Sequence, residues 1–280
     1  MLSYNFEYYK PKSIKEAIEQ YQTLKSQDKK PLYYGGGTEI LTLGRLNYIY
    51  TDAIIDLKGI PECKVFGFQN NELIIGSTLS LSVFEENKVF PLLTNTSKEV
   101  ADYSSRNSIT IGGNICGQIF YREAVLPFLL SDSTVIIAGP SGEKKILINE
   151  IFNKELRLDE GEFLVQIGTE KEYLKAPYLS VKKRKQWDTG YPLLTVAALK
   201  KDGIIRFAFS GVCSYPFRSI PMEKILNDKK LSYKERVLAS FEYLPSPILN
   251  DIEGSDGYRL FVLENTLSNI LSYLGGEELE

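Results

Sequence analysis

Two glycine-rich segments constrain this chain more than any other feature of its sequence. Residues 34–39 read Tyr-Gly-Gly-Gly-Thr-Glu, and residues 110–114 read Thr-Ile-Gly-Gly-Asn after an expected extended stretch at 108–111. Consecutive glycines permit positive φ and let amide groups approach a ligand with no Cβ in the way. The first segment lies between an apolar strand and the start of a helix, where free amides and the helix dipole attract anions. One glycine run is more often a tight turn, but its repetition favours backbone-lined loops that share a phosphate-bearing ligand.

The spacing of the glycines excludes two common nucleotide-binding motifs. The chain contains neither Gly-x-Gly-x-x-Gly at the start of a helix nor Gly-x-x-x-x-Gly-Lys followed by Ser or Thr. A ligand that is long enough to lie between both loops fits better. FAD has this length, because it joins a pyrophosphate to a ribityl chain with several hydroxyl groups and to a flavin ring.

Composition limits the class of protein further. The 280 residues suffice for one large domain or two of ordinary size, and we expect two. No segment approaches the roughly 20 consecutive apolar residues of a membrane span, so no membrane partner is expected. The first residues have neither a basic start nor an apolar stretch, which favours a cytoplasmic location. The net charge of −3 gives no attraction to phosphate backbones, so nucleic acid is not an expected partner.

Histidine is absent from the sequence, and cysteine is rare. A Ser-His-Asp hydrolase and a histidine-ligated metal enzyme are therefore excluded. Cys63, Cys116 and Cys213 are odd in number and far apart, which fits neither a disulfide framework nor a metal site. We expect reduced thiols and no bound metal.

Apolar periodicity and turn residues predict the order of the elements. In the first part we expect strands at 6–9, 31–34, 53–57, 73–76 and 134–139, and helices at 14–24 (capped by Ser13), from 38, and at 82–86, 92–103 and 127–130. After a charged connector at 169–177 we expect strands at 178–182, 193–200 and 204–210, and helices at 219–226, 233–243 and 257–273. The pattern predicts a domain boundary near residue 173 and, beyond it, an antiparallel sheet with helices on one face.

Both glycine segments resemble the motifs of one family. Residues 34–41 are similar to the Ala-Gly-Gly-Thr-Asp-Leu-Leu loop of the FAD-binding subunits of molybdenum hydroxylases, the group that contains xanthine dehydrogenase, CO dehydrogenase and nicotinate dehydrogenase. Residues 106–115 resemble their second motif, Arg-Asn-x-Gly/Ala-Thr-Ile-Gly-Gly-Asn. The likeness extends to the opening segment 6–17, the strand 54–57, the segment 183–199 and the final Tyr-Arg helix at 257–259.

The resemblance implies an α+β fold: a two-part FAD-binding domain of the vanillyl-alcohol-oxidase (PCMH) type at residues 1–173, then a smaller α+β domain at 174–280. It also implies an FAD-dependent oxidoreductase subunit that needs no catalytic side chain, because the flavin carries the redox chemistry. Electrons would pass between iron–sulfur centres of a partner and NAD or another acceptor. The expected partners are an iron–sulfur subunit and a molybdopterin-containing subunit, since three cysteines are too few for a cluster that takes four.

The resemblance also assigns cofactor contacts. Residues 35–40 would hold the pyrophosphate, and the second motif would hold the pyrophosphate and the ribityl region. The FAD-contacting lysine of relatives is matched by Lys183, although neighbouring lysines leave the register open, and Tyr191 is similar to an aromatic residue beside the flavin. The expected cofactor-binding residues are Tyr34, Gly35, Gly36, Gly37, Thr38, Glu39, Ile40, Arg106, Thr110, Ile111, Gly112, Gly113, Asn114, Glu123, Lys183 and Tyr191.

The chain departs from the family after its second motif. Many members place an aspartate there, in a segment such as Asp-x-x-Pro-Ala, whereas residues 118–127 here offer Glu123 as the substitute. Two alternatives therefore stay open: a free-standing flavin-dependent reductase or dehydrogenase of the same superfamily, and a non-catalytic scaffold with a degenerate FAD site. Trp187 and Asp188, beside the basic run at 182–185, are interpreted as structural residues.

Overall fold

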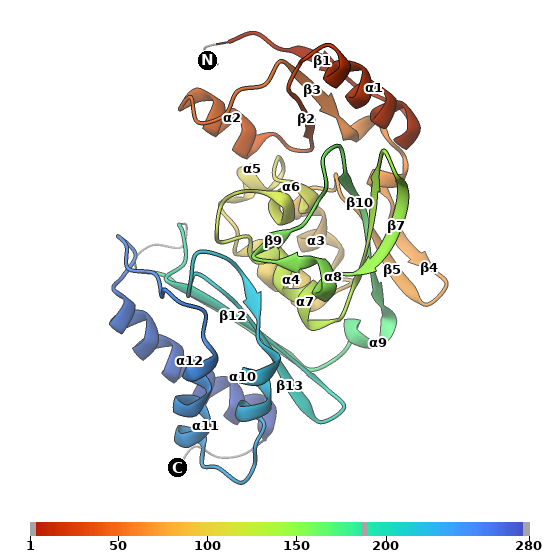
Figure 1. Ribbon diagram of the computed structural model, residues 1–280. Helices are drawn as coiled ribbons and strands as arrows, with labels where there is room; N and C mark the ends of the chain where they lie inside the picture. The colour runs from red at the N-terminus through yellow and green to blue at the C-terminus, as the bar shows by residue number, and fades with distance from the viewer. Residues whose placement is uncertain (1–3, 186–189, 277–280) are drawn as a thin grey trace.

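The computed structural model describes residues 4–185 and 190–276, so Trp187 and Asp188 lie outside the described residues. The described chain forms successive units that are stacked from top to bottom in Figure 1. A small parallel-sheet unit comes first, an antiparallel sheet with short helices follows, and a second antiparallel sheet with longer helices ends the chain. The α+β class and the order of the units are as the sequence predicts.

The N-terminal unit is a parallel sheet in the order β1-β3-β2. Its elements are β1 (Glu7–Tyr9), α1 (Ile14–Ser26), β2 (Pro31–Tyr34), α2 (Thr38–Arg45) and β3 (Ala53–Asp56). Ser13 caps α1 as predicted, because its side chain accepts a hydrogen bond from the Glu16 amide. Ala17 packs with Ile55 on one face of this sheet, whereas Ile54 belongs to the face beneath α2. The first glycine segment therefore connects the end of β2 to α2.

The middle unit is an antiparallel sheet in the order β4-β5-β10-β6-β7. Its strands are β4 (Phe66–Gln69), β5 (Glu72–Gly76), β6 (Thr134–Gly139), β7 (Gly142–Leu147) and β10 (Phe163–Glu170). Its other elements are α3 (Leu81–Asn87), α4 (Pro91–Lys98), α5 (Tyr103–Arg106), α6 (Ile111–Cys116), α7 (Leu126–Leu130), α8 (Ile148–Ile151), β8 (Phe152–Asn153), β9 (Glu155–Leu156) and α9 (Lys171–Leu174). On β10, Leu164 faces the short helices, while Phe163 and Val165 pack with α1. The sheet thus lies between the N-terminal unit and the short helices.

The prediction of a single helix at 92–103 is wrong. It is divided into α4 and α5, and Ala101 between them has a φ of +49°, which no helix residue adopts. Asp102 then caps α5 by accepting a hydrogen bond of 2.8 Å from the Ser105 amide. A new cap inside an apolar periodic stretch starts a new helix, and apolar spacing alone does not reveal this break.

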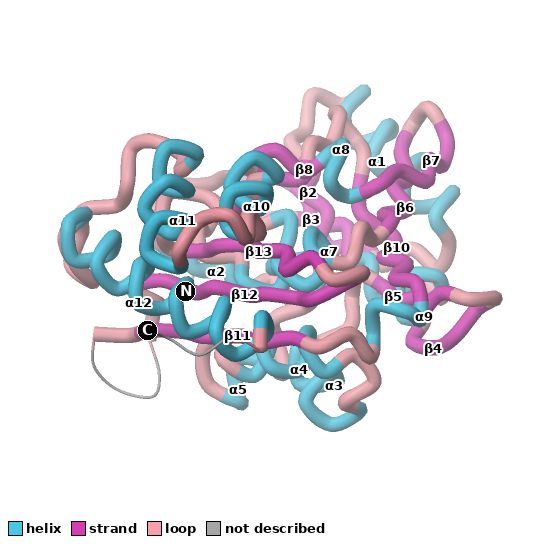
Figure 2. The backbone as a smooth tube through the Cα atoms, turned by 90° about the horizontal axis from the view of Figure 1, so that it is seen from below, coloured by secondary structure: helices cyan, strands magenta, loops and turns pink. Residues whose placement is uncertain are grey.

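The C-terminal unit is an antiparallel sheet in the order β11-β12-β13-β14. Its elements are β11 (Tyr178–Lys183), β12 (Leu194–Lys201), β13 (Ile204–Ser210), β14 (Phe217–Arg218), α10 (Ile220–Leu226), α11 (Tyr233–Ser240) and α12 (Asp256–Gly275). These helices gather on one face of the sheet, as predicted (Figure 2). Within the described ranges no helix, α12 included, has the length and apolarity that a membrane crossing needs.

The two faces of β12 join the C-terminal helices to the middle unit. Val196 and Ala198 pack with the helices, whereas Ala197 and Leu199 belong to the apolar cluster of the middle unit. This alternation follows from the two-residue period of a strand. The proposed boundary near residue 173 falls in α9, and the core continues across it. The proposed domains 1–173 and 174–280 therefore share a buried interface.

A polar cluster around Asp132 closes this interface at one end. The Asp132 carboxylate accepts hydrogen bonds from Arg206 on β13 at 2.6 Å and from Arg218 at the end of β14 at 2.7 Å. Asn149 and Tyr173 donate to the same carboxylate. Burial alone would raise the pKa of Asp132, but the hydrogen bonds and charges of the two arginines outweigh it and hold the pKa below its ordinary value.

Replacing Asp132 is expected to destabilise the fold in a pH-dependent way. Asp132→Asn removes the charge that both guanidinium groups face, which lowers the free energy of unfolding at pH 7 by about 1–3 kcal/mol. Because the pKa is depressed in the folded state, the wild-type advantage is complete above the ordinary aspartate pKa of about 3.9 and disappears as the pH falls further. Urea unfolding at several pH values measures this. Asp202→Asn, at an exposed carboxylate, is the control, and equal stability of the two variants would contradict the prediction.

Candidate functional site

The two glycine segments meet in space, backbone against backbone. A Cβ on Gly36 would lie 1.7 Å from the carbonyl oxygen of Ser108, and one on Gly35 would lie 2.6 Å from Oγ1 of Thr110. Real Cβ atoms do not come this close to other atoms, so glycine is required at position 36, where the neighbour is backbone, and a side chain at position 35 would have to displace the Thr110 hydroxyl. The absence of a Cβ here serves the packing of one segment on the other, which brings the start of α2 next to the start of α6.

The first segment ends in an uncapped helix start. Gly37 is the N-cap of α2 with a φ of +73°, and no side chain caps the helix. The Leu41 amide donates to Gly37, so the amides of Thr38, Glu39 and Ile40 precede the first intrahelical hydrogen bond. These amides lie at the positive end of the helix dipole, a position where an anion such as a phosphate could bind.

The second segment is built differently from the expected loop. Residues 107–108 form a turn and α6 begins at Ile111, so both glycines are helical. Its amides already donate within the protein: Ile111 to Leu79 O, Gly112 to Ser77 O, Gly113 to Thr110 Oγ1 and Asn114 to Thr110 O, at 2.8–3.1 Å. The Thr110 hydroxyl proton and the Asn114 side-chain amide nitrogen remain as donors, while Asn114 Oδ1 accepts from the Ala124 amide.

Glu39 joins α2 to the segment after α6. Its carboxylate accepts a hydrogen bond of 2.6 Å from the Gln118 amide, and a Cβ on Gly117 would lie 2.5 Å from Oε2. Glu39 therefore fixes the approach of the two segments. Its carboxylate is turned toward protein amides, so its contribution to an anion site is through the backbone amide.

Two other expected contacts have their side chains engaged inside the protein. Arg106 forms an ion pair with Glu85 and donates to the carbonyl oxygens of Val100 and Ala101, and its side chain is only 9% exposed. Ile111 is fully buried in the core of the middle unit. The structure thus gives Arg106 and Ile111 roles in holding the second segment in place.

Glu123 lies in a buried ion pair with the C-terminal sheet. One carboxylate oxygen accepts from Lys182 Nζ at 2.9 Å and the other from Thr195 Oγ1 at 2.6 Å. Burial lowers the pKa of Lys182, and the charge of Glu123 opposes this shift. Lys183 is exposed and shares its strand face with Val181, which packs toward the C-terminal helices. Lys182 is thus the lysine of the basic run that faces Glu123.

Tyr191 lies beside the segment that follows the second motif. Its ring stacks on Tyr121 with 4.7 Å between the ring centroids and 15° between the planes. Tyr121 is buried, and its carbonyl oxygen accepts a hydrogen bond from Ser210 on β13. Tyr191 remains 54% exposed, which leaves ring surface for a partner.

One functional candidate has no signal in the sequence. Lys58 follows β3, and its ammonium donates a hydrogen bond of 2.5 Å to the carbonyl oxygen of Gly35. It also lies 4.4 Å from the ring centroid of Tyr34, which covers Gly37. A lysine after a strand is unremarkable in sequence, and only the parallel pairing of β2 with β3 brings it to the glycine segment.

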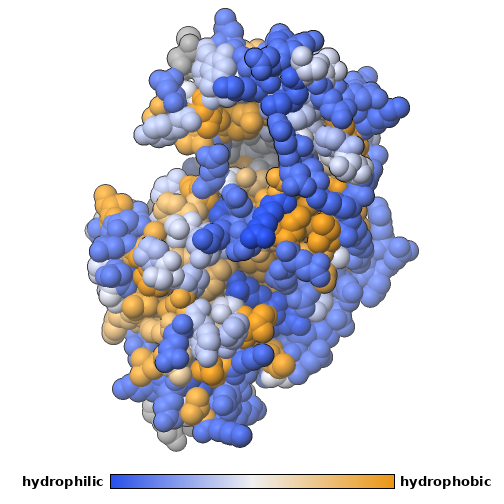
Figure 3. Space-filling model, viewed as in Figure 1, coloured by the Kyte–Doolittle hydropathy of each residue, from blue (hydrophilic) through white to orange (hydrophobic). Residues whose placement is uncertain are grey.

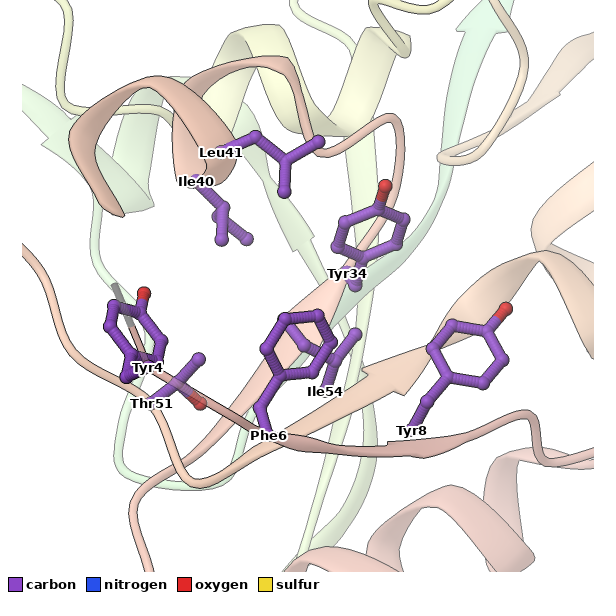
Figure 4. A pocket seen from close by; sticks show the side chains of 8 residues that line it. All are labelled: Tyr4, Phe6, Tyr8, Tyr34, Ile40, Leu41, Thr51 and Ile54. Atoms are coloured by element: carbon purple, nitrogen blue, oxygen red, sulfur yellow. The ribbon is translucent and has the colours of Figure 1, made fainter. Parts of the chain in front are cut away.

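A cavity of about 180 Å³ lies next to the first segment, between α2 and the sheet (Figure 4). It is lined mainly by aromatic and aliphatic groups: Tyr4, Phe6, Tyr8, Tyr34, Ile40, Leu41, Thr51 and Ile54. This lining suits a ring or an aliphatic group and not a phosphate. The molecular surface is also hollowed between the N-terminal unit and the rest of the molecule, at the left of Figure 3.

Two glycine segments packed together, an uncapped helix start and an antiparallel C-terminal sheet are the features to compare with known protein families. Residues 4–168 match the family model described as the FAD binding domain in molybdopterin dehydrogenase, and the chain belongs to this family. It is thus an FAD-binding component of the molybdenum-hydroxylase class of oxidoreductases. The expected FAD domain and enzyme class are confirmed.

Two relatives and one solved structure are similar to this chain along most of its length. The chain is 26% identical over 239 residues to the glyceraldehyde dehydrogenase medium chain of Sulfolobus acidocaldarius, covering 81% of this chain and 83% of that one. It is 23% identical to the nicotinate dehydrogenase FAD-subunit of Eubacterium barkeri, covering 75% and 72%. A chain of carbon monoxide dehydrogenase from Hydrogenophaga pseudoflava has the same fold, with a TM-score of 0.85, 22% identity and 99% of each chain covered.

The buried ion pair of Glu123 and Lys182 predicts that two neighbouring lysines differ strongly in their effect on stability. Lys182→Met leaves Glu123 buried without its counter-charge, and we expect the free energy of unfolding to fall by about 3–5 kcal/mol. Lys183→Met, the matched control on the exposed face, is expected to change it by about 0.5 kcal/mol or less. Urea unfolding followed by circular dichroism measures both. A larger loss at Lys183 than at Lys182 would show that the strand register is wrong.

Proposed function

We propose that this chain is the FAD-carrying electron-transfer subunit of a molybdenum-hydroxylase-like complex. In this role it takes electrons from iron–sulfur centres of a partner subunit and delivers them to NAD or another acceptor. Family membership and the names of relatives, which include a medium chain and an FAD-subunit, support the proposal. A molybdopterin-containing subunit and an iron–sulfur subunit are the proposed partners, in the cytoplasm.

The observation that carries the proposal is the pairing of an anion site with side-chain donors. The amides of Thr38, Glu39 and Ile40 would hold the pyrophosphate. The Thr110 hydroxyl, which lies beside Gly35, and the Asn114 side-chain amide on α6 would bind the pyrophosphate and the ribityl hydroxyls. When bound, FAD supplies the chemistry that accepts single electrons and releases two together.

The protein's own part is to position the cofactor and to exclude water from it. Tyr191, stacked on Tyr121, would cover one side of the flavin ring. The buried pair of Glu123 and Lys182 would keep the C-terminal sheet closed over the second segment. Because Lys182 and Thr195 engage both carboxylate oxygens of Glu123, we expect this residue to join the two domains and not to contact FAD as the family's aspartate does.

Binding of FAD and capture of partners test the proposal together. The purified chain is expected to bind FAD at one to one, with flavin absorbance bands, and a tagged chain purified from its own cells is expected to bring iron and molybdenum with it. Gly113→Val places a Cβ at an exposed position only 2.8 Å from the Thr110 hydroxyl oxygen, so it would displace this donor and should abolish flavin binding. Gly67→Val is the matched control, because no atom lies within 4 Å of its Cβ position.

The outcomes separate the alternatives. If the folded protein binds no FAD, the result would support the alternative of a non-catalytic scaffold with a degenerate FAD site. Stoichiometric FAD without iron or molybdenum in the tagged preparation would indicate a free-standing reductase or dehydrogenase.

A further inference from the structure

Lys58 contacts the first glycine segment from the side of the parallel sheet. Its Nζ lies 2.5 Å from the carbonyl oxygen of Gly35 and 2.9 Å from Oδ1 of Asp56. The parallel pairing of β2 with β3 sets Tyr34 opposite Asp56, so a residue just beyond β3 reaches the residue just beyond β2. The contact is therefore built into the sheet register and does not depend on a flexible loop.

Asp56 fixes the ammonium group in this position. The carboxylate is buried and also accepts hydrogen bonds from the Tyr8 hydroxyl and, at 2.9 Å, from the Lys58 amide. Burial alone would raise the pKa of Asp56, but the hydrogen bonds outweigh it and keep the pKa below its ordinary value. Burial and the nearby carboxylate raise the pKa of Tyr8 to about 12, so its hydroxyl remains a donor. Asp56 therefore remains a charged anchor for Lys58 at neutral pH.

The hydrogen bond from Lys58 decides which way a peptide group points. In a trans peptide the carbonyl and the following N–H point in opposite directions. Holding the Gly35 carbonyl toward Lys58 therefore turns the Gly36 amide away from Lys58. It also keeps a carbonyl oxygen, which would repel a phosphate, from turning toward the anion site. Gly35 and Gly36 have no side chains that restrict the rotation of the peptide group between them, so a contact from outside the segment is needed to fix its orientation.

We propose that Lys58 is a positioning residue for the diphosphate of the bound dinucleotide, acting through the Gly35 carbonyl to set the amides of the first glycine segment. This inference rests on the proposed FAD site. The side chain touches protein groups, so its effect on the ligand is through the backbone, with its positive charge as a secondary contribution.

Three variants test the proposal by FAD titration, which does not depend on enzyme activity. Lys58→Met is expected to weaken FAD binding about tenfold, the effect of losing one charge-assisted hydrogen bond. ADP, which carries the diphosphate without the flavin, is expected to compete with FAD and to lose affinity by the same factor. Lys58→Arg can still donate to the carbonyl and should stay within about threefold of wild type. Lys64→Met, at an exposed lysine nearby, is the control and should bind like wild type.

The possible results are distinct. An unchanged FAD dissociation constant in Lys58→Met would overturn the inference and leave the FAD site intact. Equal weakening in Lys58→Met and Lys58→Arg, together with a lowered melting temperature in both, would also overturn it, because the role would then be structural. Wild-type protein that does not bind FAD would instead remove the proposed function on which the inference rests.

Discussion

The backbone contact between the first glycine segment and residues 108–110 is the constraint on which the rest of the structure depends. No side chain fits at Gly36, where a Cβ would lie 1.7 Å from a carbonyl oxygen, and this lets the parallel-sheet unit approach the middle unit. Glu39 strengthens the contact by accepting from the Gln118 amide across the same boundary. Because this contact fixes the uncapped start of α2, the first segment lies beside Thr110, whose hydroxyl oxygen would be 2.6 Å from a Cβ on Gly35.

The two segments contribute different groups despite their similar sequences. Among the described residues, the amides of Thr38, Glu39 and Ile40 have no acceptor, whereas the amides of residues 111–114 all donate to Thr110 or to residues 77–79. Glycine serves close packing in both, since a Cβ on Gly112 would lie 2.7 Å from atoms of Ser77. A similar motif therefore provides backbone donors in one place and side-chain donors in the other. This division follows from what each segment packs against.

Much of the fold could be predicted because its signals are local. Ser13 before an apolar helical stripe, the strand before the first glycines and the antiparallel C-terminal sheet are all encoded over a few residues. Apolar spacing could not show that Ala101 adopts a positive φ and divides a helix. Nor could it decide which lysine of the run 182–185 faces the FAD-binding domain, because a shift of one residue in the strand register moves every side chain to the opposite face of the sheet.

The site was predictable in its motifs and less so in its supporting residues. The glycine segments carry their signal in composition, but Lys58 gains its place only from the pairing of β2 with β3. Arg106, part of the second motif, lies in an ion pair with Glu85 that is distant in sequence. Lys58 and Arg106 hold the glycine segments through contacts with residues that are distant in sequence. A single sequence does not specify which contacts those are.

Amide hydrogen exchange, resolved residue by residue with NMR and measured without and with saturating FAD, tests the central claim most directly. Amides without an acceptor exchange fast until a ligand binds them, whereas bonded amides are already protected. We predict that FAD slows exchange strongly at Thr38, Glu39 and Ile40, and that residues 111–114 exchange slowly in both states. Protection by FAD at 111–114 with none at 38–40 would contradict the assignment of the pyrophosphate to the first segment.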